Sequence, residues 1–326
     1  MVAKKPFGTT KTGIAVFSYT IANSRGIEIT VLDYGAAIRS VVLPHKGERT
    51  DILLGYDTVE EYERNDGYVG ASIGRYAGRI PDSILRIGDD AFPVTANEGK
   101  NQLHGGRVGF DKRVWHAETG DDSVTFSLRS EDGDEGFPGT LFAFATYELK
   151  EDTLYITYRG RADETTAWNP TNHAYWNLNG HAAGDTRAHR LEIPAERYVP
   201  VGPDMIAESG EADVNGSRFD FRAMREIGGA YDHCFELSKG PIRLSGNIGI
   251  GLEIETDCRA VQFYNAGNLN ERKGKDGKIY RPFDAVCLET EGRQARKNRP
   301  VAEENVLPAG GETVRRTAFR FIFQEE

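Results

Sequence analysis

The sequence predicts an all-β protein, organised as one large β-sandwich with few short helices. Three observations predict this fold class. Short runs that alternate apolar and polar residues recur along the whole chain. The 37 glycines imply many turns between short strands. No repeat and no low-complexity linker divides the chain, so we expect a single domain over residues 1–326, a size that all-β domains reach.

The first expected elements are short strands between residues 14 and 54. Turn-forming residues at 23–26 and 46–48 separate them. The first expected helix follows at residues 58–64 and is about two turns long, and a second candidate helix covers residues 221–226. The strands are expected at residues 14–17, 26–32, 38–43 and 52–54.

The middle of the chain shows the clearest alternation. Residues 123–130 and 142–148 each place every second side chain on one face, as a half-buried strand does. A turn at residues 151–152 then leads into a strand at 154–158, which predicts a hairpin. Later strands are expected at residues 252–256, 261–264, 285–290 and 313–323.

The composition excludes several classes of function. A formal net charge of −10 makes general binding to nucleic acid or an anionic membrane improbable, because such binding needs a basic face. No apolar run is long enough to cross a bilayer, and no signal segment follows Met1. We therefore expect a cytoplasmic monomer or homodimer with a small-molecule substrate. Cys234, Cys258 and Cys287 are widely spaced and are expected to be buried small hydrophobes without disulfides or zinc.

The most unusual stretch is residues 169–178, which read Asn-Pro-Thr-Asn-His-Ala-Tyr-Trp-Asn-Leu. It surrounds His173 with amides, hydroxyls and aromatic rings. Histidine gives and takes a proton near neutral pH, so His173 is a candidate acid or base. A core histidine held by hydrogen bonds is an equally good interpretation of this stretch alone.

Two further islands precede this stretch. In the first, Arg75 and Arg79 flank Gly78 and could bind hydroxyls or an anion, although paired arginines on a strand are more often solvated charges. In the second, His104 is followed by two glycines. Glycines let a backbone approach a ligand closely, and a tight turn is the alternative explanation.

Two candidate carboxylates lie after the stretch 169–178 in the sequence. Asp232 precedes a short apolar strand and could accept hydrogen bonds from sugar hydroxyls or cap a turn. Glu289 follows a strongly apolar run, where partial desolvation raises the pKa of a carboxyl toward the range of a general base. An isolated glutamate at a strand end is more often structural.

Taken together, five islands resemble the aldose 1-epimerases, the galactose mutarotases. They occur in the order of that family, with similar spacing, from about residue 34 to the last strand. The matching islands are residues 74–77 (Gly-Arg-Tyr-Ala), 103–106 (Leu-His-Gly-Gly) with 109–115 behind them, 132–139, 171–175 (Thr-Asn-His-Ala-Tyr) and 288–290 (Leu-Glu-Thr).

The resemblance implies a large twisted antiparallel sandwich with a sugar cleft on one face. It implies interconversion of the α and β anomers of a free aldohexose such as glucose or galactose, with no metal or organic cofactor. By position, His173 corresponds to the general acid and Glu289 to the general base. The implied sugar-hydroxyl ligands are Arg75, His104 and Asp232, with Gln262 and Tyr264 as neighbours of the cleft.

The chain departs from the family pattern at several positions. Gly78 stands where the family usually has Asn, and Glu291 and residues 294–296 replace a pattern of Gln followed later by Pro-Asp-Ala. Glu289 and Glu291 share a strand face. We hypothesise that Glu291 raises the pKa of Glu289 by repulsion or is itself neutralised by a nearby arginine. The candidate arginines are Arg75, Arg79 and Arg293.

Four alternatives remain open from the residues. A non-catalytic sugar-binding protein would have no use for an acid opposite a base. A metal site formed by His104, His173 and Glu289 lacks the short spacings typical of metal ligands. A glycosidase would need two carboxylates flanking the bond. A hexose-6-phosphate 1-epimerase would need cations for the phosphate, for which the candidates are Arg75, Arg79, Arg293, Arg296 and Lys297.

Overall fold

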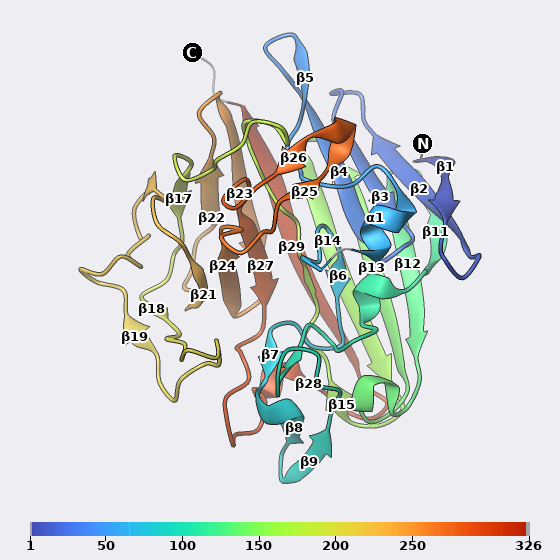
Figure 1. Ribbon diagram of the computed structural model, residues 1–326, viewed down its shortest axis with the longest axis vertical. Coiled ribbons are helices and arrows are strands. Elements are labelled where there is room, and N and C mark those ends of the chain that lie inside the picture. Colours follow the sequence, from blue (N-terminus) through green and yellow to red (C-terminus); the bar gives the residue numbers. More distant parts are fainter. Residues whose placement is uncertain (1, 65, 324–326) are drawn as a thin grey trace.

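The computed structural model describes residues 2–64 and 66–323, and its regular structure is almost entirely β (Figure 1). Within that part of the chain, α1 (Val59–Glu63) is the only α-helix, and five short 3-10 turns accompany it. The all-β prediction is therefore confirmed. The 3-10 turns are η1 (Pro81–Ser83), η2 (Phe110–Lys112), η3 (Asp134–Gly136), η4 (Lys275–Gly277) and η5 (Glu303–Asn305).

One layer of the sandwich is a nine-stranded antiparallel sheet with the order β11-β12-β13-β14-β29-β23-β22-β17-β20. Its central strand is the C-terminal strand β29, which pairs with β14 of the predicted hairpin of β13 and β14 on one side and with β23 on the other. The strands are β11 (His116–Thr119), β12 (Ser123–Ser130), β13 (Leu141–Lys150), β14 (Thr153–Ala162), β17 (Arg190–Glu192), β20 (Arg225–Glu226), β22 (Ile242–Ser245), β23 (Ile250–Thr256) and β29 (Glu312–Phe323).

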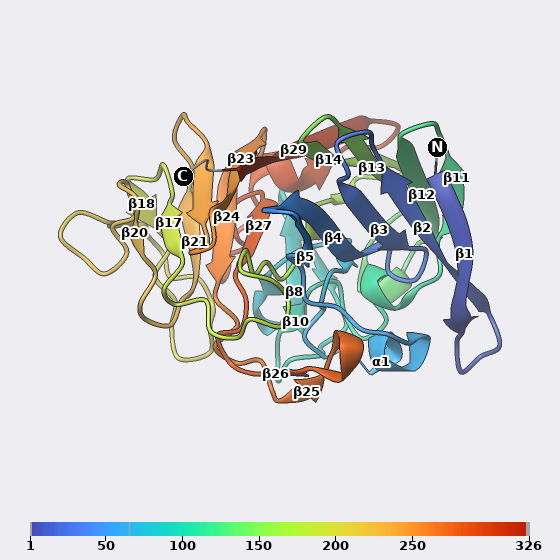
Figure 2. The same cartoon turned by 90° about the horizontal axis from the view of Figure 1, so that it is seen from above.

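The second layer contains two five-stranded sheets that lie against the two halves of the large sheet (Figure 2). The first runs β1 to β5 in chain order, and the second has the order β19-β18-β21-β24-β27. These strands are β1 (Val2–Thr9), β2 (Ala15–Ala22), β3 (Glu28–Leu32), β4 (Ala37–His45), β5 (Glu48–Asp51), β18 (Arg197–Tyr198), β19 (Ala212–Asp213), β21 (Asp232–Glu236), β24 (Ala260–Tyr264) and β27 (Cys287–Glu291).

Short two-stranded ribbons form the loops at the ends of the layers. Two of them, β6 with β16 and β7 with β10, lie next to the site described below. The ribbon strands are β6 (Ser72–Ile73), β7 (Arg79–Ile80), β8 (Ile84–Ile87), β9 (Asp90–Pro93), β10 (Gln102–Leu103), β15 (Thr166–Ala167), β16 (Thr171–Asn172), β25 (Arg272–Lys273), β26 (Ile279–Tyr280) and β28 (Val306–Leu307).

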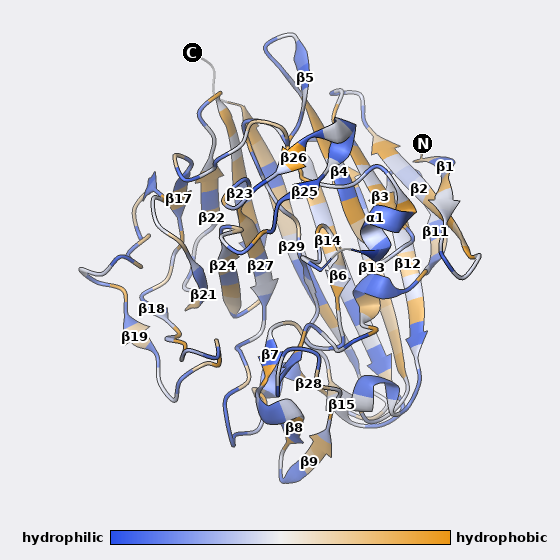
Figure 3. Ribbon diagram, in the orientation of Figure 1, coloured by the Kyte–Doolittle hydropathy of each residue, from blue (hydrophilic) through white to orange (hydrophobic). Residues whose placement is uncertain are grey.

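Burial follows the alternation of the sequence, which Figure 3 shows as alternating colours along the strands. In β13 every second side chain from Leu141 to Leu149 is buried in the core between the layers. The face of Phe142, which is 45% exposed, points away from that core. Because a fully buried large apolar side chain contributes about 1.5–3 kcal/mol, this period of two holds the layers together.

The stretch 169–178 lies between the two five-stranded sheets. Trp176 forms one isolated bridge with Leu53 and another with Val286. Its N–H donates to the Val286 carbonyl at 2.9 Å, and the Val286 N–H donates back at 2.8 Å. The backbone of His173 is paired with a different segment: its N–H donates to the carbonyl of Ala71, and its carbonyl accepts from the N–H of Gly70. Residues 70–71 therefore fix the backbone of His173.

One of the two expected helices is present. α1 begins after Thr58, whose side chain caps the helix in a capping box with Glu61. The helix expected at residues 221–226 is wrong. The carbonyl of Phe221 accepts from the N–H of Ile193, and Arg225 lies in strand β20. The backbone bonds of this segment go to neighbouring segments, so no helical ladder forms.

The cysteine and membrane predictions can also be compared with the structure. Cys234 and Cys287 are buried as expected, whereas Cys258 is only partly buried, and all three are free thiols. Within residues 2–64 and 66–323, no helix has the length and apolar character needed to span a bilayer.

Candidate functional site

A polar cavity of about 220 Å³ opens where the β21-β24-β27 sheet meets the loops around residues 66–79 and 98–104. Its volume lies below the range of about 300–1,000 Å³ typical of drug-sized ligands, so it suits one small polar molecule. The lining residues used below are Tyr68, Gly78, Arg79, Glu98, His104, His173, Tyr175, Asp232, Gln262, Tyr264, Glu289, Glu291 and Gln294.

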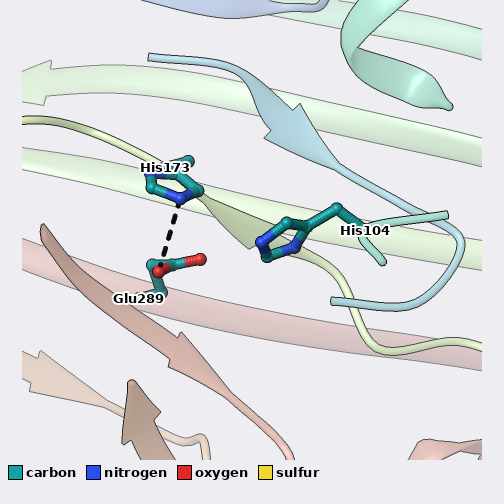
Figure 4. Close-up of side chains that lie close together, drawn as sticks. All are labelled: His104, His173 and Glu289. Atoms are coloured by element: carbon teal, nitrogen blue, oxygen red, sulfur yellow. Dashed lines mark ion pairs between the residues drawn. The ribbon is translucent and has the colours of Figure 1, made fainter. Parts of the chain in front are cut away.

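His173 and Glu289 face each other inside this cavity (Figure 4). The Nε2 atom of His173 lies 3.6 Å from Oε1 of Glu289. The two residues are only 4% and 2% exposed. The imidazole is stacked with Tyr175 at 5.0 Å and with Tyr68 at 6.0 Å between ring centroids. These rings fix the plane of the imidazole, and its Nε2 edge is turned toward the carboxyl group.

Burial shifts the pKa values of the two groups in opposite directions. Desolvation lowers the pKa of His173 to about 4. Desolvation, with further repulsion from Glu291 and Asp232, raises the pKa of Glu289 well above its usual value, against the attraction of Arg79. Burial therefore favours the neutral form of each group, and a single proton shared by the pair is held by Glu289 rather than by the imidazole. The contact is then not an ion pair, and one group can give a proton while the other takes one.

His104 contributes a third ring to the site. Its Nδ1 accepts a hydrogen bond from the Gly78 N–H at 3.3 Å, so the ring proton is on Nε2 and can be donated. Its ring meets that of His173 edge to face at 5.5 Å. The glycine that follows, Gly105, has φ +88°, and an added Cβ would lie 1.9 Å from the carbonyl of Gly74. The close approach that this glycine permits is thus to the protein's own backbone.

Asp232, Gln262 and Gln294 form a hydrogen-bonded chain along one wall. Gln262 Nε2 donates to Asp232 Oδ1 at 2.6 Å, and Gln294 Nε2 donates to Gln262 Oε1 at 2.9 Å. Strand pairing places Gln262 directly beside Glu289. Tyr264, two residues further along β24, also lines the cavity. The wall therefore offers fixed polar groups next to the carboxyl group of Glu289.

Arg79 is one of two arginines that line the cavity; the other, Arg272, is paired with Asp66. Strand β7 pairs with β10 so that Arg79 lies opposite Leu103, the residue before His104. Its guanidinium forms a two-pronged pair with Glu98 at 2.6 and 2.7 Å. Such a pair holds the planar group in one orientation, with its remaining N–H donors free to bind a ligand.

The structure places Arg75 elsewhere, which corrects its expected position at the cleft. Arg75 is 1% exposed, and it is not among the described residues that line the cavity. Its guanidinium donates to the carbonyls of Ser130, Glu131 and Pro138 at 2.7 to 2.9 Å, and also to the hydroxyls of Ser130 and Thr166. All its donors are used inside the protein, so this arginine anchors a loop.

Glu291 lies beside Glu289 on the same face of β27 and lines the cavity. Desolvation raises its pKa to about 8, with Arg315 as the main opposing charge. Repulsion by Glu291 does raise the pKa of Glu289, whereas neutralisation of Glu291 by one of the expected arginines is wrong. Those arginines are engaged elsewhere: Arg75 with backbone carbonyls, Arg79 with Glu98, and Arg293 with Glu236 and Glu304.

His104, His173 and Glu289 also have the geometry of a metal-binding cluster. One potential ligand atom from each residue lies within 4.8 Å of the other two. Two imidazoles and a carboxylate are ligands that zinc accepts. The spacing in the sequence did not indicate this cluster, because strand pairing brings the three residues together from distant segments.

Comparison with known proteins shows the family of the chain. A sequence profile of the family described as Aldose 1-epimerase matches residues 18–320. The chain belongs to the aldose 1-epimerase family. The aldose 1-epimerase of Escherichia coli K12 is 35% identical over 93% of this chain and 94% of its own length. The galactose mutarotase of Mus musculus is 32% identical over 98% of both chains.

Solved structures in this family have the same fold. The galactose 1-epimerase of Lactobacillus acidophilus NCFM superimposes with a TM-score of 0.88 at 26% identity, covering 100% of this chain and 99% of that one. The aldose epimerase homologue of C. elegans gives a TM-score of 0.88 at 28% identity, covering 94% of this chain and 98% of that one. The predicted mutarotase-like sandwich is thereby confirmed.

Three residues used in this description of the site, Tyr68, Tyr175 and Gln294, were not among the candidate ligands named from the sequence, whereas Arg79 was named with Arg75. Tyr175 lay in the same stretch as His173, so its proximity to that motif was an available signal. Tyr68 and Gln294 had none, because they reach the cavity through the packing of loops.

Proposed function

We propose that this chain is an aldose 1-epimerase, an isomerase that interconverts the α and β anomers of free aldohexoses such as glucose or galactose. The observation that carries the proposal is the buried imidazole–carboxyl pair of His173 and Glu289, 3.6 Å apart in a polar cavity. The names of the relatives, aldose 1-epimerase and galactose mutarotase, support the same reaction.

In this mechanism the two groups act on the two oxygen atoms bonded to C1 of the sugar, which suits their separation of 3.6 Å. Glu289 takes the proton of the C1 hydroxyl, and His173 gives a proton to the ring oxygen. The bond between C1 and the ring oxygen breaks, leaving an open-chain aldehyde. Rotation about the C1–C2 bond presents the other aldehyde face, and reversal of both transfers closes the ring. Each positioned proton transfer contributes about 10²–10⁴-fold.

Binding of the sugar must ready the pair for this step. In the free protein, burial places the shared proton on Glu289. Catalysis in the direction above requires it on His173. The two forms carry the same number of protons, so no exchange with solvent is needed. Sugar hydroxyls that hydrogen-bond to Glu289 replace part of its lost hydration, which favours the ionised carboxylate.

The remaining polar groups are proposed to hold the hydroxyls of the sugar. His104 Nε2 and Arg79 act as donors, Asp232 acts as an acceptor, and Gln262 and Tyr264 complete the wall. Residues 1–326 are proposed to act as one domain, because the main core cluster draws residues from Tyr19 to Phe321. The cytoplasmic location and the state of monomer or homodimer stay predictions.

The hexose-phosphate alternative finds little support in the charges of the site. Of the five cations considered for it, only Arg79 lines the cavity, and Glu98 already neutralises it. Three carboxyl groups, those of Asp232, Glu289 and Glu291, line the same cavity and in their ionised forms would repel a phosphate. The other cations form ion pairs or hydrogen bonds elsewhere: Arg293 with Glu304, Arg296 with Glu211, and Lys297 with Asp82.

Polarimetry of freshly dissolved sugars tests the proposal. The wild-type protein should accelerate the optical rotation change of α-glucose and of α-galactose well above buffer. Hexose 6-phosphates should be slower substrates. If the protein accelerates the reaction of neither glucose nor galactose, a sugar-binding protein without catalysis is favoured. If it accelerates only the reaction of the phosphorylated sugars, the hexose-6-phosphate 1-epimerase is favoured.

A further inference from the structure

A second acidic feature lies in the cavity wall, next to Glu289. It consists of the Glu291 carboxyl and the open space beside Gly78, and we call it the acidic recess. An added Cβ on Gly78 would meet only Glu291 Oε2, at 4.0 Å. The space in front of this carboxyl is therefore left free by the protein.

The carboxyl group of Glu291 is unusual because it is buried without a full set of hydrogen-bond partners. The residue is 1% exposed, and its Oε1 has no hydrogen-bond partner within residues 2–64 and 66–323. It lines the cavity. Buried polar atoms in proteins are nearly always bonded, and an unpaired one calls for an explanation. The oxygen that faces the space beside Gly78 is Oε2, so a ligand that donates hydrogen bonds into the recess would reach this carboxyl group there.

The charges around the recess specify which donor fits best. Asp232, Glu289 and Glu291 all face the cavity. The two arginines that line the cavity are already paired, Arg79 with Glu98 and Arg272 with Asp66. Arg315, the cation that acts on Glu291, donates to Asn169 and Asn305 instead. Acidic side chains therefore outnumber the unpaired cations of the site, and a positive ligand substituent would stabilise Glu291 in its ionised form.

The spacing along β27 places such a substituent on the same sugar that Glu289 would act upon. Glu289 and Glu291 are two residues apart on one strand face, which separates their Cα atoms by about 6.6 Å. This is comparable to the width of a pyranose ring. When the C1 hydroxyl lies at Glu289, a substituent on another ring carbon can reach Glu291.

We propose that the acidic recess binds the ammonium group of an amino sugar, and that Glu291 makes the chain prefer aminodeoxyaldoses over the corresponding neutral aldoses. This inference rests on the proposed epimerase function and adds the substrate class. Glu291 acts here as a specificity-determining residue, and the proton transfers stay with His173 and Glu289.

The test compares kcat/KM for glucose with kcat/KM for glucoses carrying an amine at C2, C3 or C6. Rates of mutarotation are measured at a pH below the pKa of the sugar amine, with the rate in buffer subtracted. We expect at least one amino sugar to exceed glucose by about tenfold, the effect of one charge-assisted hydrogen bond. A ratio of two substrates in one preparation does not depend on the fraction of folded protein.

Three variants locate the effect. Glu291→Gln removes the charge and should bring the ratio close to one. Gly78→Asn should do the same by filling the recess, since asparagine tolerates the φ of +76° at this position. Glu236→Gln, a matched substitution on β21 where Glu236 contacts Arg293, should keep the wild-type ratio.

The outcomes separate the two proposals. If the wild-type protein accelerates neither glucose nor any amino sugar, the epimerase function itself fails. If it accelerates glucose but no amino sugar exceeds it, the inference about the recess is overturned. A tenfold preference that survives both Glu291→Gln and Gly78→Asn would also overturn it, because the ammonium group would then bind elsewhere.

Discussion

His173 Nε2 and Glu289 Oε1 lie 3.6 Å apart, with both side chains almost fully buried in one cavity. This separation is longer than a hydrogen bond between nitrogen and oxygen, so the two groups do not saturate each other. Each group therefore still has a lone pair or a proton with which it can form a hydrogen bond to a ligand. Because burial lowers the pKa of one and raises that of the other, they form a donor and an acceptor with one proton between them.

The pH dependence of kcat/KM should follow from this shared proton. Below about pH 4, His173 is protonated as well as Glu289, so the pair holds two protons and neither group can accept one from the sugar. At high pH, Glu289 loses the shared proton at a pKa well above its ordinary value. We expect a bell-shaped profile whose acid limb lies near pH 4. An acid limb near 6.5, the ordinary pKa of histidine, would show that His173 is not desolvated in the working enzyme.

Substitution of Glu291 by glutamine should move the alkaline limb of this profile to lower pH. The charge of Glu291 raises the pKa of Glu289, and an amide carries no such charge. Asp232 and Arg79 also act on Glu289 and are unchanged in this variant. Rates across the pH range for both proteins check the shift. An unmoved alkaline limb would mean that repulsion between the two glutamates has no part in setting the pKa.

The two arginines of residues 74–80 should respond differently to replacement by methionine. Arg75→Met leaves three buried carbonyls without their donor, so we expect a loss of about 3–5 kcal/mol in the free energy of unfolding. Arg79→Met removes a partly exposed ion pair, so its stability should change by less than about 1 kcal/mol. Its kcat/KM should fall, because a sugar ligand is lost.

Urea unfolding and steady-state kinetics on both variants measure the two effects. The folded fraction of Arg75→Met should keep a KM close to that of the wild type. The opposite pattern, with Arg75→Met stable and defective in KM, would return Arg75 to the sugar site.

Removal of metal ions should leave the activity unchanged. His104, His173 and Glu289 could hold an ion, but the proposed reaction uses the same nitrogen and oxygen atoms for proton transfer. Dialysis against a chelator, followed by polarimetry, checks this. Loss of activity that added zinc restores would show that the cluster is a metal centre.

Much of this fold can be predicted from local sequence patterns. The period of two in residues 123–130 and 142–148 predicted β12 and β13, and the stretch 58–64 predicted α1, which the structure shows to be capped by Thr58. These features depend on neighbours in the chain. The helix expected at residues 221–226 is absent because a contact between distant parts of the chain decides the local structure there. The backbone of this segment bonds to segments that are distant in the sequence, such as the one that contains Ile193.

The site was predicted only where a motif marks it. His173 and Glu289 sit in motifs that resemble the family, and the structure places them together. The choice between Arg75 and Arg79 could not be made from spacing, because it depends on the pairing of β7 with β10. The same holds for Tyr68, which reaches His173 through the packing of a loop.

A crystal structure of the Glu289→Gln variant with bound galactose tests the central claim most directly. The account predicts the C1 hydroxyl within about 3 Å of the residue 289 side chain and the ring oxygen within about 3 Å of His173 Nε2, the reach of a hydrogen bond. Galactose bound with its C1 hydroxyl and ring oxygen away from both residues would contradict it.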